Sequence, residues 1–149
     1  EEVIAQITKL QSVSLCANLP GQILTYLMVS PPKPGEPSFA RYAGERARIL
    51  AELAARATMM HEGLNRIPGI RCQPIDGAMY AYPSVSLPPG RTDEEYCMAL
   101  LEATGVCVVP GSGFGQKPGS AHFRTTILPP MGQLERVIAA IAAFHGQWK

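Results

Sequence analysis

The sequence lacks the features that mark nucleic-acid-binding, membrane-spanning and secreted proteins. Thirteen basic residues stand against twelve acidic ones, with no basic run, so no surface for a polyanion is indicated. There is no apolar run of about 18 residues and no charged leader followed by an apolar core. We therefore expect no nucleic acid and no membrane among its partners.

Metal-ligand spacing is also missing. The four cysteines form no C-x-x-C pair and have no histidine at ligand distance along the chain: Cys16, Cys72, Cys97 and Cys107. Structural zinc sites need such pairs. We predict no metal site and interpret the cysteines as buried free thiols of a reducing compartment.

The glycine-rich run GSGFG at 111–115 departs from both common phosphate-binding motifs. A dinucleotide fingerprint would need its last glycine at Gln116, and a P-loop would need a glycine directly before Lys117, which is again Gln116. We interpret these glycines as residues that allow positive φ and a close approach of the backbone to another group.

The length, the hydrophobic content and the periodicity of the sequence predict one layered domain, preceded by a helical segment. The length of 149 residues and the 46% hydrophobic content suit about one globular domain. Periodicity and breakers give the order of elements, in which Asp76-Gly77 marks a hairpin and Thr92 to Glu95 a capping box. The predicted elements are short helices at 3–10 and 21–29, a proline-rich connector at 30–37, a helix at 38–66, strands at 70–75 and 78–87, a helix at 92–105, strands at 106–110 and 122–128, and a last helix after Pro130.

One arginine interrupts an apolar strand pattern in HFRTTIL, residues 122–128. Alternation places His122, Arg124 and Thr126 on one face of this strand. Arg124 is either a solvated or surface-paired residue, as most arginines are, or a guanidinium fork that holds a carboxylate with two hydrogen bonds. The residues alone leave both open. For Tyr80 and Tyr82, which share a strand face, a place in the core is favoured over a place in a cleft.

Most of the chain resembles the C-terminal part of the alanine aminotransferase family, which belongs to the pyridoxal-phosphate-dependent aspartate aminotransferase superfamily of fold type I. VVPGSGFG followed by FRTTILPP carries the resemblance most specifically, because GSGFGQ and ILPP point to the alanine branch. Further matching runs, in chain order, are LQSVSLCANLPGQ, VSPPKPGEPSFARY, ILAELAARA and PIDGAMYAYP.

The resemblance implies an α/β, α+β-layered small domain at 38–149. Residues 1–37 would then be a helical segment from the edge of the large domain plus the connector. It also implies that Arg124 binds the α-carboxylate of the substrate. Gly111, Ser112 and Gly113 would form a lid or entrance loop.

The lysine that forms a Schiff base with the cofactor in this family has no counterpart in this sequence, whose lysines are Lys9, Lys33, Lys117 and Lys149. A chain that starts at Glu1 without methionine is interpreted as a fragment. The resemblance implies that the full-length enzyme transfers an amino group between L-alanine and 2-oxoglutarate with pyridoxal phosphate. We expect this chain alone to be inactive, with no catalytic residue and no bound cofactor.

Two other interpretations stay open. The enzyme could act on other pairs, as the glutamate–glyoxylate and kynurenine or aromatic types do, or the chain could be a non-catalytic α/β ligand-binding module. The expected partners are an amino acid and a 2-oxo acid, the large domain of the same polypeptide, and a second copy in a homodimer. The expected compartment is the cytoplasm, with the mitochondrial matrix as the alternative.

Overall fold

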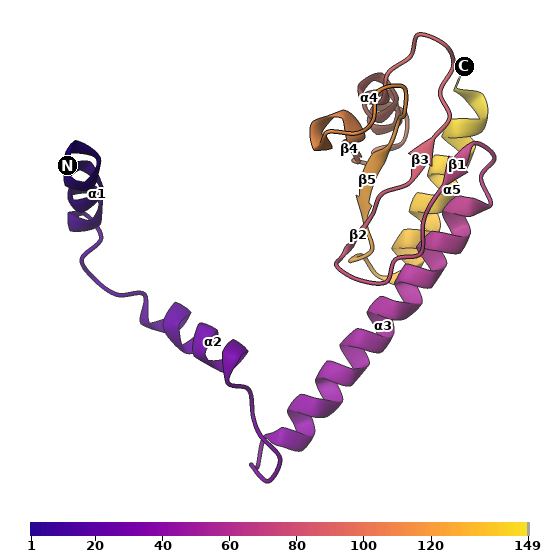
Figure 1. The fold of residues 1–149 in the computed structure, drawn as a ribbon. Helices are drawn as coiled ribbons and strands as arrows, with labels where there is room; N and C mark the ends of the chain where they lie inside the picture. The colour runs from indigo at the N-terminus through magenta and orange to yellow at the C-terminus, as the bar shows by residue number, and fades with distance from the viewer. Residues whose placement is uncertain (149) are drawn as a thin grey trace. The chain divides into compact units, whose positions relative to one another are not determined.

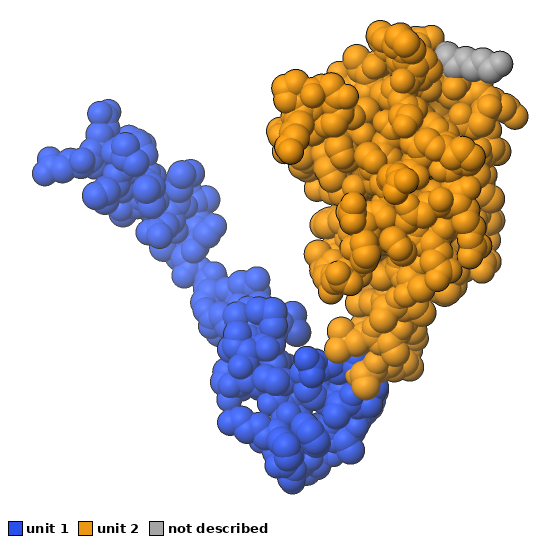
Figure 2. All heavy atoms as spheres, turned by 45° about the vertical axis from the view of Figure 1, so that its right-hand side comes forward, with its two compact units in different colours: residues 1–46 blue, residues 47–149 orange. Residues whose placement is uncertain are grey.

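The computed structural model describes residues 1–148, and the chain divides into two compact units, Glu1–Arg46 and Ala47–Lys149 (Figure 2). The first unit holds α1 (Glu2–Ser12) and α2 (Leu19–Val29). The side chain of Asn18 caps α2 by accepting a hydrogen bond of 3.1 Å from the Gly21 amide, which satisfies one of the free N–H groups at the helix start. Both predicted short helices are confirmed.

No residue of the first unit is buried. The apolar side chains of its two helices are largely exposed, as at Val3 (71%), Leu10 (74%) and Leu24 (67%). The apolar character of α2 led us to expect burial on most sides. The residues of its own unit do not supply that burial.

The helix α3 (Phe39–Asn65) begins in the first unit and continues into the second. Its apolar face enters the core over its C-terminal half: Leu50 is 52% exposed, Leu53 packs against the core while partly buried, and Met60 and Leu64 are fully covered. Glu52 and Arg56, four residues apart on the helix, form an ion pair at 2.9 Å. Arg56 also donates a 2.7 Å hydrogen bond to the carbonyl of Leu128, which ties the helix to the strand region.

Within residues 1–148, five short strands form two antiparallel sheets. The sheet of two joins β1 (Ile70–Arg71) to β3 (Ser84–Val85), and the sheet of three has the order β2 (Tyr80–Ala81), β5 (Phe123–Thr126), β4 (Val109–Pro110).

The predicted hairpin around Asp76-Gly77 is confirmed only in part, because the two runs pair antiparallel at their outer ends and not next to the turn. β1 pairs with β3, whereas β2 pairs with β5. Pro83 explains the split, because a proline has no N–H to donate and cannot continue a ladder on both sides. The second run therefore divides into two strands with different partners.

The remaining helices close the core of the second unit. Thr92 and Glu95 form the predicted capping box at the start of α4 (Asp93–Thr104), and α5 (Met131–Gln147) runs beside α3 along one face of the strands (Figure 1). The largest fully buried side chains come from all layers: Met60, Leu64, Pro83, Tyr96, Leu100, Phe123, Leu134 and Ile141. The layered helix-and-sheet fold predicted from the sequence is thus confirmed.

Cysteine burial differs from the prediction at two positions. Cys72 and Cys97 are buried, but Cys16 and Cys107 are exposed. Cys107 precedes Val108, which is buried, so the alternation of an extended segment turns the Cys107 side chain outward.

Residues 1–148 contain neither a membrane-spanning helix nor a metal-binding cluster. None of these helices combines the length and the apolar character that crossing a bilayer requires. No group of three or more His, Cys, Asp or Glu side chains within that range could hold a metal ion.

Candidate functional site

The candidate site lies on the outward face of β5. Phe123 and Thr125 point into the core with 0% and 9% exposure, while Arg124 and Thr126, which alternate with them, are partly exposed. β4 pairs with β5 at Arg124, and β2 pairs with it at Thr126. The alternation predicted from the sequence is therefore confirmed, and Arg124 sits on the central strand of its sheet.

Two aromatic rings surround the guanidinium of Arg124. Its Cζ lies 4.6 Å from the ring centroid of Tyr80 and 4.7 Å from that of Phe114. Aromatic faces attract a cation but offer no lone pair to its N–H groups. No carboxylate of residues 1–148 lies within 4.0 Å of the guanidinium nitrogens.

The two tyrosines of the β2 segment lie on the exposed face, contrary to the core placement that the sequence favoured. Tyr80 is 45% and Tyr82 40% exposed, while Ala81 between them is 1% exposed. The small alanine and the following proline fill the core side, so the large rings alternate outward. The Tyr82 ring stacks on that of His122 with centroids 4.9 Å apart and meets Phe114 edge-on at 6.0 Å.

The glycine-rich run folds as a short 3-10 helix, η1 (Gly111–Phe114), and ends at Gly115 with φ +69°. Gly111 is buried, and its amide donates to the carbonyl of His122 at 2.8 Å. A Cβ at Gly111 would lie 2.5 Å from Gln116 Oε1 and 2.7 Å from the Tyr82 hydroxyl. Close approach and positive φ, the two roles predicted for these glycines, thus fall on Gly111 and Gly115.

A buried carboxylate on α4 holds this loop. Asp93 is 5% exposed, and its Oδ2 accepts 2.8 Å hydrogen bonds from the Ser112 amide and from Gln116 Nε2. Gln116 Oε1 in turn lies 3.0 Å from His122 Nδ1. The sequence placed Asp93 only in the first turn of a helix, because its loop partners are 19 and 23 residues away.

The structure therefore brings the predicted site residues together. The loop of Gly111, Ser112 and Gly113 leads directly to Phe114, which contacts Arg124. Among residues 1–148, the guanidinium on this partly exposed surface has neither an acidic partner nor a hydrogen-bond acceptor. It can bind an anion, and a planar carboxylate matches the guanidinium fork.

Several groups in the core of the second unit have shifted pKa values. Burial raises the pKa of the Tyr96 hydroxyl, and burial, with Asp93 and Cys107 nearby, raises that of Cys97 to about 12. Burial lowers the pKa of His145, against a backbone hydrogen bond with Pro68 that raises it. The Cys97 thiol is therefore protonated and unreactive at neutral pH.

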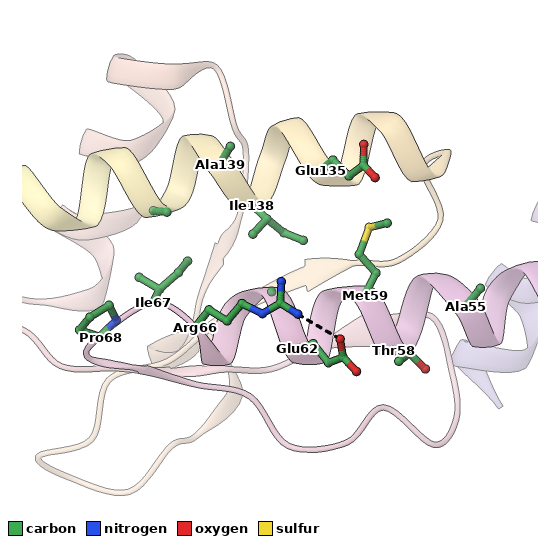
Figure 3. A pocket seen from close by; sticks show the side chains of 12 residues that line it. Ala55, Thr58, Met59, Glu62, Arg66, Ile67, Pro68, Glu135, Ile138 and Ala139 are labelled. Carbon is green, nitrogen blue, oxygen red and sulfur yellow. Dashed lines mark hydrogen bonds and ion pairs between the residues drawn. The ribbon is translucent and has the colours of Figure 1, made fainter.

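A groove of about 670 Å³ lies between α3 and α5 (Figure 3). Its lining includes Met59 and Ile138, with the ion pair of Glu62 and Arg66 at 3.3 Å beside them. No lining residue belongs to the sheet that carries Arg124. The groove is thus separate from the candidate site.

Comparison with known proteins gives a consistent family match. A sequence model described as aminotransferase class I and II matches residues 1–141. Alanine aminotransferase 1 of Bos taurus is 49% identical over 153 residues, covering 96% of this chain and 31% of that protein. The human protein of the same name is 47% identical over 153 residues, again covering 96% and 31%.

Solved structures agree with the sequence matches. An alanine aminotransferase from Pyrococcus furiosus superposes with a TM-score of 0.73 at 31% identity, covering 98% of this chain and 34% of that one. An aspartate aminotransferase from Rhizobium meliloti gives a TM-score of 0.63 at 27% identity, covering 84% and 30%. The chain thus spans about a third of the relatives that it matches.

Proposed function

This chain belongs to the family of class I and II aminotransferases, and we propose that the protein of which it is a part transfers an amino group between L-alanine and 2-oxoglutarate. The support for alanine is the similarity to proteins named alanine aminotransferase in both sequence and structure. Within the reaction, this chain supplies the group that holds the carboxylate of the amino acid.

Arg124 is the residue that we propose for this binding. The observation that carries the proposal is its guanidinium, which lies against Tyr80 and Phe114 with no acidic partner among the residues described. An α-carboxylate would supply the missing anion through two parallel, charge-assisted hydrogen bonds. The rings would also exclude water from the pair, which strengthens it.

The loop of Gly111, Ser112 and Gly113 is proposed as the entrance to this site. It carries Phe114 to the guanidinium, and a Cβ at Gly113 would meet no atom within 4 Å. The loop is open to solvent at Gly113 and tightly packed at Gly111. A segment that borders a substrate needs both an open side and a fixed attachment. Closing such a segment excludes water from the reacting groups.

The residues described here do not fit the cofactor. Pyridoxal phosphate acts as an electron sink and needs a lysine amine for its imine, but Lys9, Lys33 and Lys117 are all exposed. None of these lysines is buried, as a lysine enclosed with a cofactor would be. We therefore assign cofactor binding to the rest of the polypeptide, which is also the proposed cover for the apolar faces of α1 and α2. As in the family resemblance, the full-length enzyme is proposed to be a homodimer.

The test is a comparison of amino donors on the full-length protein supplied with pyridoxal phosphate. Alanine, aspartate, tyrosine and kynurenine are each assayed with 2-oxoglutarate, and glutamate with glyoxylate. The proposal expects the highest kcat/KM for alanine. A tenfold preference for another pair would overturn the substrate assignment, and no transamination with any pair would favour a non-catalytic module.

A further inference from the structure

We infer that Asp93 is a positioning residue for Arg124 and acts through the glycine-rich loop. This inference rests on the proposed function, because it concerns how the carboxylate-binding group is held. Asp93 lies on α4 and does not contact the aromatic rings around the guanidinium in any recorded interaction. Its influence must therefore pass through the residues that it binds.

The carboxylate of Asp93 is bound as a buried anion. A buried charge is costly unless hydrogen bonds or opposite charge compensate it. Here the Ser112 amide and Gln116 Nε2 donate to the same oxygen, both at 2.8 Å. Its position as the first residue of α4 adds the positive end of the helix dipole. Hydrogen bonds to an ionised acceptor are about twice as strong as neutral ones, so this end of the loop is firmly held.

The two loop residues that Asp93 binds flank Phe114 on both sides. Ser112 precedes Phe114 by two residues, and Gln116 follows it by two. The segment between them is thus held through the backbone amide of Ser112 and through the side chain of Gln116, and it places the Phe114 ring centroid 4.7 Å from the Arg124 Cζ. Loss of Asp93 would release both ends together.

A second path leads from Asp93 to the strand of Arg124. An ionised carboxylate only accepts, so Gln116 must turn its NH₂ group to Asp93 and its oxygen to His122. His122 Nδ1 then donates its N–H to Gln116 Oε1. His122 is two residues before Arg124 and stacks on Tyr82, whose ring meets Phe114. The contacts through Ser112 and those through Gln116 and His122 therefore both lead to Phe114, the ring that covers Arg124.

The experiment is a double-substitution cycle in the full-length enzyme with alanine and 2-oxoglutarate. The variants are Asp93→Ala, Arg124→Lys and the two combined. Glu94→Ala is the matched control, since Glu94 lies in the same helical turn and touches the loop only at the Ser112 hydroxyl, at 3.3 Å. Because a displacement of about 1 Å can cost about 100-fold in rate, we expect kcat/KM to fall roughly tenfold in Asp93→Ala. The control should change less than about twofold.

The cycle separates positioning from general stability. If Asp93 acts through Arg124, then Asp93→Ala lowers kcat/KM by less than about threefold in the Arg124→Lys background, because coupled residues are not additive. An equal tenfold fall in both backgrounds, or an unchanged kcat/KM in Asp93→Ala, would overturn the inference. If Asp93→Ala does not fold, Gln116→Ala takes its place in the same cycle with the same criteria. Failure of the proposed function is distinct, since Arg124→Lys alone would then retain kcat/KM.

Discussion

The guanidinium carbon of Arg124 lies 4.6 Å from the ring centroid of Tyr80, a residue brought to it by the pairing of β2 with β5. Phe114 approaches the same guanidinium from the glycine-rich loop. Two segments that are more than 30 residues apart in the sequence thus supply the two aromatic rings that contact this guanidinium.

Removal of the Phe114 ring should weaken substrate binding. A cation–π contact contributes about 0.5 to 2 kcal/mol, depending on how far it is desolvated. At about 1.4 kcal/mol per tenfold, Phe114→Leu should raise the KM for alanine by roughly 2- to 30-fold in the full-length enzyme. Tyr80→Phe, which keeps the ring, is the control and should leave KM within about twofold. Equal KM values for Phe114→Leu and the wild type would show that the ring does not act on Arg124.

Substitution by alanine should destabilise the protein at Gly111 but not at Gly113, the two glycines of η1. A Cβ at Gly111 would lie 2.8 Å from His122 Cβ, besides its contacts with Gln116 and Tyr82, whereas one at Gly113 would meet open space. Overpacking typically costs about 1 to 3 kcal/mol, and substitutions at open surface sites stay within about 0.5 kcal/mol. Urea denaturation of Gly111→Ala and Gly113→Ala measures both free energies of unfolding. Similar losses in the two variants would be inconsistent with the fixed inner side of the loop.

Acid should destabilise the second unit through His145. Burial lowers the folded pKa of His145 below 6.5, so the unfolded chain binds more protons between the two pKa values, and stability rises with pH there. The contribution is present above about pH 6.5 and is lost as the pH falls through the folded pKa. His145→Gln should therefore flatten the decline in the free energy of unfolding between pH 7.5 and pH 5.5. An unchanged pH slope in that variant would contradict the assignment.

Residues 1–29 should exchange their amide protons rapidly in the isolated chain. Neither α1 nor α2 has a buried residue, and helices of 11 residues are marginal without tertiary packing. The amides of the α5 core face, such as those of Leu134 and Ile141, should exchange slowly in the same sample. Hydrogen exchange on a sample proven to be monomeric measures this. Slow exchange throughout residues 1–29 would argue against it.

The helices and the face of β5 could be predicted because their signals are local. The capping box at Thr92 and Glu95 and the alternation around Arg124 each depend on a few neighbouring residues. The partner of β2 could not be predicted in this way, since Tyr80 pairs with Thr126, 46 positions further on. Pro83 and the small Ala81 were overlooked: the proline interrupts the predicted strand, and the alanine takes the core side in place of the tyrosines.

The surroundings of Arg124 were missed for a similar reason. The sequence singled out Arg124 and the glycine run separately, but it gave no sign that Phe114 would cover the guanidinium. The sequence predicted only that Asp93 lies at the start of a helix. Its burial and its two hydrogen bonds to the loop result from tertiary packing. Long-range hydrogen bonds of this kind leave no periodic pattern in the chain.

The most direct measurement is the kinetics of Arg124→Lys in the full-length enzyme, with Arg136→Lys on the exposed side of α5 as the control. Truncating one partner of a desolvated charge pair costs about 2 to 5 kcal/mol, and an ammonium keeps the charge but not the planar fork. The account predicts that kcat/KM for alanine falls by roughly 30-fold, at about 1.4 kcal/mol per tenfold. Cofactor absorbance and the control variant should stay unchanged. A fall of less than about fivefold, under ~1 kcal/mol, would contradict the account and assign Arg124 a structural role.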